Sequence, residues 1–394
     1  MAVPGLDDLL AGDGVAGKRV FVRADLNVPI ADGQVGDDTR VRASLPTLRR
    51  LLAAGARVVL ASHLGRPKGQ VKPEFSLRPV AGVLAQELGC GVSFCETTVG
   101  PEAEAAVEEL GDGQILLLEN LRFHPGETAN DRDFAQALAR LADVYVNDAF
   151  GTAHRAHAST AGMAEFVPRR AAGDLLRAEL EHLRVVLEPE RPLLCLLGGA
   201  KVSDKLAVLE ALAPRADVLA VGGAMAYTFL AARGEPIGTS LVETERFDEA
   251  RRVEAAAAAA DRRLLLPVDH VVARSLDPDA PSRVVKEIPD GWMGVDIGPE
   301  TAARYAAEAK AAKTVFWNGP MGVFEVDAFA KGTEAVAAGV AGSSATSVVG
   351  GGDSLAAVNK LGVGGRISHL STGGGASLEF VQGLALPGVT ALER

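Results

Sequence analysis

The sequence Leu193-Leu194-Cys195-Leu196-Leu197-Gly198-Gly199-Ala200-Lys201-Val202-Ser203-Asp204-Lys205 joins an apolar run, two glycines and two lysines. Glycine lets the backbone approach a ligand closely, and on a helix an i, i+4 pair places both ammonium groups on one face. A strand, a glycine turn and a helix start form an anion site, because free N–H groups and the helix dipole point to one place. The stretch differs from the Walker pattern G-x-x-x-x-G-K-[ST]. It predicts a strand–turn–helix anion site; the alternative is a tight turn with solvated lysines.

Two further glycine clusters follow apolar runs near the end of the sequence. Gly350-Gly351-Gly352-Asp353-Ser354 follows Ser347–Val349, and Gly373-Gly374-Gly375 follows Ser371-Thr372. Three such clusters in the second half indicate one phosphate-rich ligand that is held by backbone groups. Asp353 adds an oxygen ligand of the kind that Mg²⁺ prefers beside phosphates.

Short apolar runs alternate with helical patterns along the whole sequence. This alternation predicts an α/β fold with parallel sheets that are covered by helices on both faces. So many strands divide more naturally into two sheets than into one. The predicted strands are Val20–Val22, Val58–Leu60, Val92–Phe94, Ile115–Leu118, Val144–Val146, Leu193–Leu197, Val218–Val221, Leu264–Leu266, Val315–Trp317 and Ser347–Val349. The predicted helices include Ser44–Ala54, Ala103–Leu110, Asp131–Leu141 and Arg246–Ala260.

One long helix is predicted between the two halves, at Asp174–Leu187. Its leucines recur at helical spacing, Gly173 precedes it, and Pro189 ends it. We therefore expect two Rossmann-like three-layer αβα domains whose parallel sheets face each other across a cleft, joined by this hinge helix. The length of 394 residues is sufficient for two or three domains, each with a sizeable core.

The composition narrows the class of partner. The formal net charge is −11, which argues against a nucleic-acid surface, so any basic cluster is local and suited to a small anion. No apolar run is long enough to span a membrane, and the first residues lack the pattern of a secretory signal. Cys90, Cys95 and Cys195 have no metal-ligand spacing and are interpreted as reduced core thiols. We expect a cytoplasmic protein.

Basic and polar side chains follow the predicted strands of the first half. Ligands of open α/β sheets bind beyond the carboxyl ends of the strands, and arginine donates paired hydrogen bonds to carboxylate and phosphate. One such arginine is usually a surface ion pair, but recurrence at equivalent positions indicates an anion site. Whether His63, His154 and His157 belong to this site or to the core stays open. The set is Arg23, Asp25, Asn27, His63, Arg66, Glu119, Asn120, Arg122, Asn147, Asp148, His154, Arg155 and His157, with Arg40 at a helix start.

The second half carries glycine-rich segments that suit a nucleotide. Gly222-Gly223 offers a flat surface for a purine, the segment around Gly294 offers another close backbone approach, and Glu325 can accept ribose hydroxyls. An NAD-dependent dehydrogenase is a competing hypothesis. Its G-x-G-x-x-G pattern occurs at Gly12–Gly17, but there it precedes a strand and lacks the strand–turn–helix context, so we reject that hypothesis.

In this order, the motifs resemble those of the phosphoglycerate kinase family from end to end. The resemblance rests on Val22–Pro29, Ser62–Pro67, Glu119–Phe123, Asn147–Phe150, His154–His157, Gly198–Lys205, Trp317–Glu325, Gly350–Ser354 and Gly373–Ala376. Departures are small: Ser354 replaces a common threonine, and Leu176–Leu180 lacks a frequent Lys-Glu pair. The resemblance implies a monomer that converts 1,3-bisphosphoglycerate and ADP to 3-phosphoglycerate and ATP with Mg²⁺. It also implies a phosphoglycerate-binding domain (1–173), a hinge helix (174–189), a nucleotide-binding domain (190–377) and a segment (378–394) that returns to the first domain.

The resemblance also implies roles for individual residues. The residues for phosphoglycerate are Asp25, Leu26, Asn27, Arg40, His63, Leu64, Gly65, Arg66, Arg122 and Arg155. Those for the nucleotide are Lys201, Lys205, Gly222, Gly223, Gly294, Asn318, Pro320, Glu325, Gly351, Gly352, Asp353 and Ser354. The implied catalytic residues are Arg40, Lys201 and Gly375, and Asp353 is the implied Mg²⁺ ligand.

The residues themselves agree with this chemistry. A carboxylate acceptor is already a nucleophile at neutral pH, so fixed cations and N–H groups are needed more than a general base. The sequence supplies those groups and shows no Ser-His-Asp or Cys-His arrangement. The remaining alternative is a nucleotide-sensing protein without catalysis, although Arg40, Lys201 and Asp353 are all present.

Overall fold

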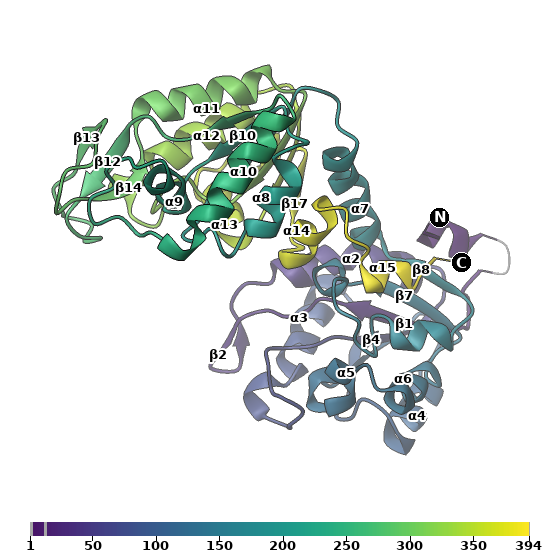
Figure 1. The fold of residues 1–394 in the computed structure, drawn as a ribbon. Helices are drawn as coiled ribbons and strands as arrows, with labels where there is room; N and C mark the ends of the chain where they lie inside the picture. The colour runs from purple at the N-terminus through teal and green to yellow at the C-terminus, as the bar shows by residue number, and fades with distance from the viewer. Residues whose placement is uncertain (1–2, 12–13, 394) are drawn as a thin grey trace. The chain divides into compact units, whose positions relative to one another are not determined.

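The computed structural model describes residues 3–11 and 14–393, which form two compact units (Figure 1). The first unit comprises Met1–Leu180 and Ala385–Arg394, and the second comprises Glu181–Leu384. Their border lies inside helix α7 (Asp174–Leu187), whose predicted bounds are confirmed. Gly12 and Asp13 of the rejected glycine pattern lie outside the described residues, as do Met1, Ala2 and Arg394.

The first unit is built on a six-stranded parallel sheet with the order β5-β6-β4-β1-β7-β8. The prediction of parallel strands is confirmed, and β8 is an additional short strand. The strands are β1 (Arg19–Ala24), β4 (Arg57–Ala61), β5 (Val92–Cys95), β6 (Ile115–Leu118), β7 (Val144–Asp148) and β8 (Arg170–Ala172). Because β1 lies between β4 and β7, the polar residues that follow these three strands emerge at the same edge.

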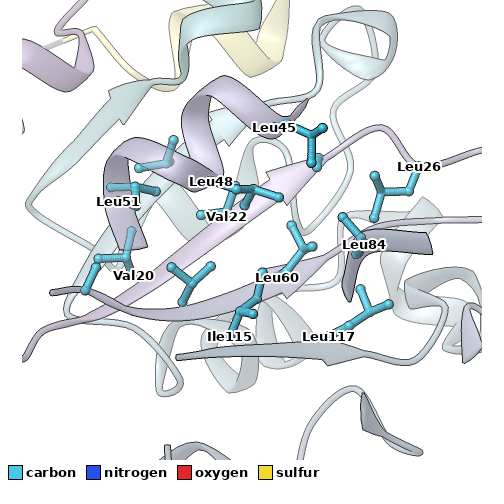
Figure 2. Close-up of a cluster of buried hydrophobic side chains, with 14 of the residues drawn as sticks. Val20, Val22, Leu26, Leu45, Leu48, Leu51, Leu60, Leu84, Ile115 and Leu117 are labelled. Atoms are coloured by element: carbon cyan, nitrogen blue, oxygen red, sulfur yellow. The ribbon is translucent and has the colours of Figure 1, made fainter. Parts of the chain in front are cut away.

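The core of this unit shows why the sequence folds in layers. Leucines at helical spacing on α2 (Thr39–Ala53) and alternate residues of the strands, such as Val20 and Val22, meet in one buried cluster (Figure 2). The residues between them on β1, such as Phe21, point to the opposite face of the sheet. In Figure 1, α4 and α6 lie on the side of the sheet opposite α2. The other helices are α1 (Leu6–Leu10), α3 (Arg78–Leu88), α4 (Pro101–Glu108), α5 (Pro125–Ala129), α6 (Arg132–Ala139) and α15 (Pro387–Thr390).

The second unit contains a parallel sheet with the order β11-β10-β9-β15-β16-β17. In chain order the strands run 3-2-1-4-5-6, which is the order of dinucleotide-binding folds, and it reverses between β9 and β15. The strands are β9 (Leu193–Leu197), β10 (Val218–Val221), β11 (Arg263–Leu265), β15 (Thr314–Asn318), β16 (Thr346–Gly350) and β17 (His369–Ser371). The helices are α8 (Leu206–Leu212), α9 (Met225–Ala232), α10 (Phe247–Ala259), α11 (Pro299–Ala311), α12 (Lys331–Ala341), α13 (Gly352–Lys360) and α14 (Gly375–Val381).

Two small antiparallel sheets were not predicted. One has the order β13-β12-β14 and consists of β12 (His270–Ala273), β13 (Arg283–Val285) and β14 (Met293–Ile297). The other is a hairpin of β2 (Ile30–Ala31) and β3 (Gln34–Val35). The two residues of β2, the two of β3 and the three of β13 are too few to show an alternating pattern, and β13 is largely exposed. Short 3₁₀ helices occupy Pro73–Phe75, Leu121–Phe123, Phe150–Thr152, Gly162–Glu165, Thr244–Arg246, Asp327–Phe329 and Gly364–Arg366.

The last described residues are bonded within the first unit. Asn147 Nδ2 donates to the carbonyl of Gly388 at 3.1 Å, and Arg170 Nη2 donates to the carbonyl of Glu393 at 3.2 Å. Helix α14, in contrast, belongs to the second unit. Within the described ranges, no helix has both the length and the apolar character required to cross a membrane.

The three cysteines are free thiols. Cys95 and Cys195 are buried, as predicted, but the prediction that Cys90 is a core thiol is wrong. Cys90 follows Gly89, the left-handed residue that ends α3, and is therefore in an exposed turn.

Candidate active site

A cavity of about 200 Å³ opens in the second unit, where the strand order reverses. Its walls come from residues that follow β9, β10 and β15 and from strand β14. Five residues that were predicted to bind the nucleotide line it, namely Gly223, Gly294, Pro320, Glu325 and Asp353. Lys201, Lys205, Gly222, Asn318, Gly351, Gly352 and Ser354 are not among the lining residues.

Two glycines of the lining are required by the packing around them. A Cβ on Gly294 would overlap the hydroxyl of Tyr227, which also lines the cavity. Gly223 has φ +68°, and a Cβ there would lie 2.5 Å from the carbonyl oxygen of Gly199. The cavity is therefore narrow and has walls of backbone, which suits a flat ring.

A group of hydrogen-bond donors lies next to this cavity. Lys205 Nζ donates to the carbonyl of Asn318 at 2.9 Å and also contacts its Oδ1. Asn318 Nδ2 is buried and has no hydrogen-bond acceptor among the described residues. A Cβ on Gly351 would lie 3.1 Å from that nitrogen, and helix α13 begins one residue later without a side-chain cap. Free backbone N–H groups and an unpaired amide thus meet at one point, which favours an anion.

Ser354 supports this arrangement from inside the protein. Its side chain is buried, and its Oγ accepts a hydrogen bond from the backbone N–H of Gly319 at 2.5 Å. The same loop is fixed by Trp317, whose Nε1 donates to the carbonyl of Gly319 at 2.7 Å. In this structure the hydroxyl of Ser354 therefore positions the loop after β15.

The prediction that Lys201 and Lys205 lie on one face of a helix is wrong. Helix α8 begins only at Leu206, so Lys201 and Lys205 lie in the loop before it and share no helix face. The contacts of Ser203 explain why the helix begins later than expected. Its N–H and Oγ donate to the carboxylate of Glu243 at 3.0 and 2.5 Å. These hydrogen bonds stabilise a turn where a helix was expected. Lys201 is exposed, and no described residue accepts a hydrogen bond from it.

Lys205 has an unusual electrostatic environment. Burial lowers its pKa to about 8, although the nearby carboxylates of Asp353 and Asp204 act in the opposite direction. An additional anion close to Nζ would therefore stabilise the charged form of Lys205 and raise its pKa. Asp296, in the wall of the cavity, has its pKa raised to about 7 by burial, against the hydrogen bonds from the N–H groups of Gly332 and Ile297.

The described residues include no cluster of three or more His, Cys, Asp or Glu side chains that would form a complete metal site. Mg²⁺ is usually bound by one or two carboxylates together with substrate phosphates and waters. Asp353 is exposed in the cavity lining beside the donor group of Lys205 and Asn318. The site therefore fits a Mg²⁺ ion that would be bound by the carboxylate of Asp353 together with the phosphates of a ligand.

The first unit joins predicted residues into a second network, at the carboxyl ends of β1 and β4. Arg40 Nη1 donates to both carboxylate oxygens of Asp25 at 3.3 Å and to the carbonyl of Asn27 at 3.1 Å. Asn27 Oδ1 accepts from the N–H of Gly65 at 2.8 Å, and Arg122 Nη1 donates to the carbonyl of Gly65 at 2.7 Å.

Other predicted residues of this unit occupy different environments. The N–H of Leu26 donates to Ser62 Oγ at 2.8 Å, and the side chains of Leu26 and Leu64 are in the core. Arg66 is exposed and has no hydrogen-bond or ion-pair partner among the described residues. Arg155 Nε donates to His154 Nε2 at 3.1 Å.

This network contains more positively than negatively charged side chains. Burial and the nearby Arg23 and Arg155 lower the pKa of Arg122 to about 10. Burial, Arg23 and Arg122 lower the pKa of His63 well below its ordinary value. His157 is buried beside Glu127, and burial and Arg122 lower its pKa to about 4. Crowded cations with neutral histidines form a site that an anion would stabilise.

Several residues around both sites were not predicted. Glu127 and Ser159 are fully buried near Arg23, and Tyr227 and Asp296 line the cavity of the second unit. The sequence carried little signal for Glu127, because a glutamate that follows Pro125 is typical of any first helical turn. Gly375 begins α14 and is exposed, outside both groups of residues.

Comparison with known proteins adds an independent finding. A model of the family described as "Phosphoglycerate kinase" matches residues 7–384. A phosphoglycerate kinase of Moorella thermoacetica is 57% identical over 378 residues, which cover 95% of this chain and 96% of the relative. One of Rubrobacter xylanophilus is 59% identical over 379 residues, with 95% of each covered. The solved structure of phosphoglycerate kinase from Coxiella burnetii is similar with a TM-score of 0.91, 42% identity and 99% of each chain covered.

Proposed function

Because the chain belongs to the phosphoglycerate kinase family, we propose a division of the reaction between its two units. The enzyme catalyses the reversible transfer of a phosphoryl group from 1,3-bisphosphoglycerate to ADP, which yields 3-phosphoglycerate and ATP in glycolysis. In our proposal the first unit (1–173) binds the phosphoglycerate and the second (190–377) binds the nucleotide. The observation that carries this division is that arginines gather in the first unit, whereas the glycine-walled cavity lies in the second.

The basic network of the first unit suits a three-carbon acid phosphate. Its guanidinium groups can hold phosphate and carboxylate through paired hydrogen bonds. Asp25 and Asn27 offer acceptors to the hydroxyl of the substrate, while Arg40 already bridges them. The proposed ligand-binding residues are Asp25, Leu26, Asn27, Arg40, His63, Leu64, Gly65, Arg66, Arg122 and Arg155, with Leu26 and Leu64 contributing backbone and packing.

The cavity of the second unit suits the base and ribose of ADP. The purine would lie against Gly223 and Gly294, and the carboxylate of Glu325 would accept the ribose hydroxyls. The phosphates would meet Lys205, the unpaired Asn318 Nδ2 and the start of α13. Asp353 would hold the Mg²⁺ ion, which when bound supplies positive charge to the phosphate oxygens.

The residues proposed for the transfer itself act by charge. The carboxylate of 3-phosphoglycerate is the nucleophile in the ATP-consuming direction, so no general base has to remove a proton. Lys201 and Arg40 would stabilise charge on the phosphoryl group in flight, and the N–H of Gly375 would donate to it. We also propose that the protein works as a cytoplasmic monomer, in line with its free cysteines and with the family resemblance.

Closure of the two units is expected during the reaction. In-line transfer needs reacting atoms about 3–3.5 Å apart, and each substrate binds its own unit in this proposal. Closure about the hinge helix α7 would bring them together and exclude water that would hydrolyse the acyl phosphate. Small-angle scattering should show a larger decrease in the radius of gyration with 3-phosphoglycerate plus a nucleotide analogue than with either ligand alone. An unchanged radius in the ternary complex would argue against the hinge but not against the reaction.

Nucleotide binding is expected to weaken as the pH rises through about 8. Lys205 is protonated below its folded pKa of about 8 and neutral above it, so above that pH the binding of phosphate requires proton uptake and becomes progressively weaker, by at most about 10-fold per pH unit. The KM for ATP should therefore rise between pH 7 and 9. Calorimetry in buffers of different ionisation enthalpy should detect proton uptake on binding near pH 8.

Lys205→Arg is the matched control for this pH dependence. A guanidinium stays charged over the whole range, so the rise in KM should disappear in that variant. If the variant keeps the full pH dependence, Lys205 is not its source, and Asp296, whose pKa is about 7, becomes the responsible group.

A coupled assay for ATP formation from 1,3-bisphosphoglycerate and ADP tests the proposed function directly. Turnover that requires Mg²⁺ is the expected result. A protein that binds ADP but forms no ATP would instead be a nucleotide sensor on the same fold.

A further inference from the structure

A buried polar chain lies behind the His63 side chain in the first unit. Arg23 on β1 is fully buried, and its Nη2 lies 3.1 Å from Nδ1 of His63, which follows β4. A guanidinium has only donors and stays protonated in proteins. Nδ1 of His63 must therefore be the acceptor of this hydrogen bond, and an uncharged ring then carries its proton on Nε2.

Arg23 is itself held in a fixed direction. Its Nε donates to Ser159 Oγ at 2.8 Å, and its Nη1 donates to the carbonyl of Ala24. Ser159 Oγ donates onward to Glu127 Oε1 at 2.7 Å, and the N–H of Ser159 donates to Oε2 at 3.0 Å. Glu127 is fully buried and supplies the negative charge that a buried guanidinium requires. These hydrogen bonds fix the guanidinium of Arg23 in one orientation, in which Nη2 is directed toward His63.

We propose that Arg23 is a positioning residue that fixes His63 as a neutral imidazole with its proton on Nε2. This inference rests on the proposed function, in which His63 contacts the phosphoglycerate. It assigns a specific role to that contact: His63 donates one hydrogen bond to the acid and acts neither as a cation nor as a proton donor in the reaction. Ser159 and Glu127 act through Arg23.

The surroundings of His63 support the neutral form. Burial acts against the imidazolium, and an imidazolium would turn a second N–H toward the donor of Arg23. The charged or titratable groups around His63 are Arg23, Arg40, Arg122 and His157, while the carboxylates of Asp25 and Glu127 are bonded to Arg40 and Ser159. No hydrogen bond to Nε2 of His63 occurs among the residues that the structure describes, which leaves this N–H for a ligand.

Nitrogen-15 NMR of the intact enzyme tests the tautomer without any variant. His63 Nδ1 should have the chemical shift of an unprotonated nitrogen and Nε2 that of a protonated one, with no imidazolium at pH 7. The His63→Gln spectrum identifies the resonances. A proton on Nδ1, or an imidazolium at pH 7, would overturn the proposal even in a fully active enzyme. An inactive enzyme with the expected tautomer would instead contradict the proposed function alone.

Kinetics of three variants test the consequence for the substrate. His63→Gln keeps a donor near Nε2 and an acceptor for Arg23, so its KM for 3-phosphoglycerate should rise far less than that of His63→Ala. Arg23→Gln should raise this KM about 10-fold, with KM for ATP unchanged, because an amide can donate to or accept from Nδ1 and no longer fixes the proton of His63 on Nε2. Its NMR spectrum should show a mixture of tautomers or a higher His63 pKa. Equal loss in His63→Gln and His63→Ala, or an unaltered tautomer in Arg23→Gln, would contradict the proposal.

Discussion

Replacement of Lys201 by alanine is expected to lower kcat by about 10²–10³-fold, by analogy with the loss of one transition-state donor. Lys201 is exposed, and no described residue accepts a hydrogen bond from it, so its removal leaves no buried group unpaired. A charge that is used mainly in the transition state changes kcat far more than the KM of either substrate. Steady-state kinetics in both directions measure the effect.

Lys286→Ala is a suitable control for this prediction. Its side chain is 77% exposed and forms a surface ion pair with Glu300, so its loss should leave kcat unchanged. If Lys201→Ala retains a near-normal kcat, Lys201 has no catalytic role. A rise in the KM for ATP alone would instead assign it to nucleotide binding.

Arg122→Ala is expected to raise the KM for 3-phosphoglycerate by about 10²-fold or more, by analogy with truncation of one partner of a buried charge pair. Arg122 is buried, its Nε has no acceptor among the described residues, and its Nη1 also fixes the carbonyl of Gly65. The variant therefore loses both a charge and the position of the neighbouring loop. Arg155→Ala should act in the same direction, and the KM for ATP should stay constant in both.

Arg132→Ala provides the comparison within the same unit. The Arg132 side chain is 73% exposed and pairs with Glu165 at the surface, so we expect its KM values to equal those of the unmodified enzyme. Parallel increases in the KM for both substrates after Arg122→Ala would refute the division into an acid-binding and a nucleotide-binding unit. Thermal unfolding of the variant distinguishes lost binding from lost structure.

The sequence was most informative where apolar runs are long. The runs at Leu193–Leu197 and Ile115–Leu118 are strands with those bounds, and the leucines of α7 give the helix bounds as predicted. Each of these segments buries a regular set of side chains, so its period shows in the sequence. Strand β13 lacks such a set, because it belongs to a small sheet outside the main one and none of its three residues is fully buried.

Contacts made by polar groups were less predictable. The spacing of Lys201 and Lys205 indicated a helix face. The carboxylate of Glu243, forty residues after Ser203, accepts hydrogen bonds from Ser203 and stabilises a turn in place of the expected helix. The link from Arg23 through Ser159 to Glu127 joins segments that are more than a hundred residues apart, and no local pattern reveals it. Glycines were recognised more easily, since Gly223 and Gly294 occur in motifs where a side chain would overlap its neighbours.

The return of residues 385–393 to the first unit has a consequence for biosynthesis. During translation, the ribosome produces all of Glu181–Leu384 after it has made the first 180 residues and before it adds this segment. The second unit is contiguous and can fold as soon as it emerges, whereas the first waits for Gly388 and Glu393 to meet Asn147 and Arg170. The unit that is synthesised first is therefore the last to be completed, and nascent chains stalled before residue 385 should show protease sensitivity in the first unit alone.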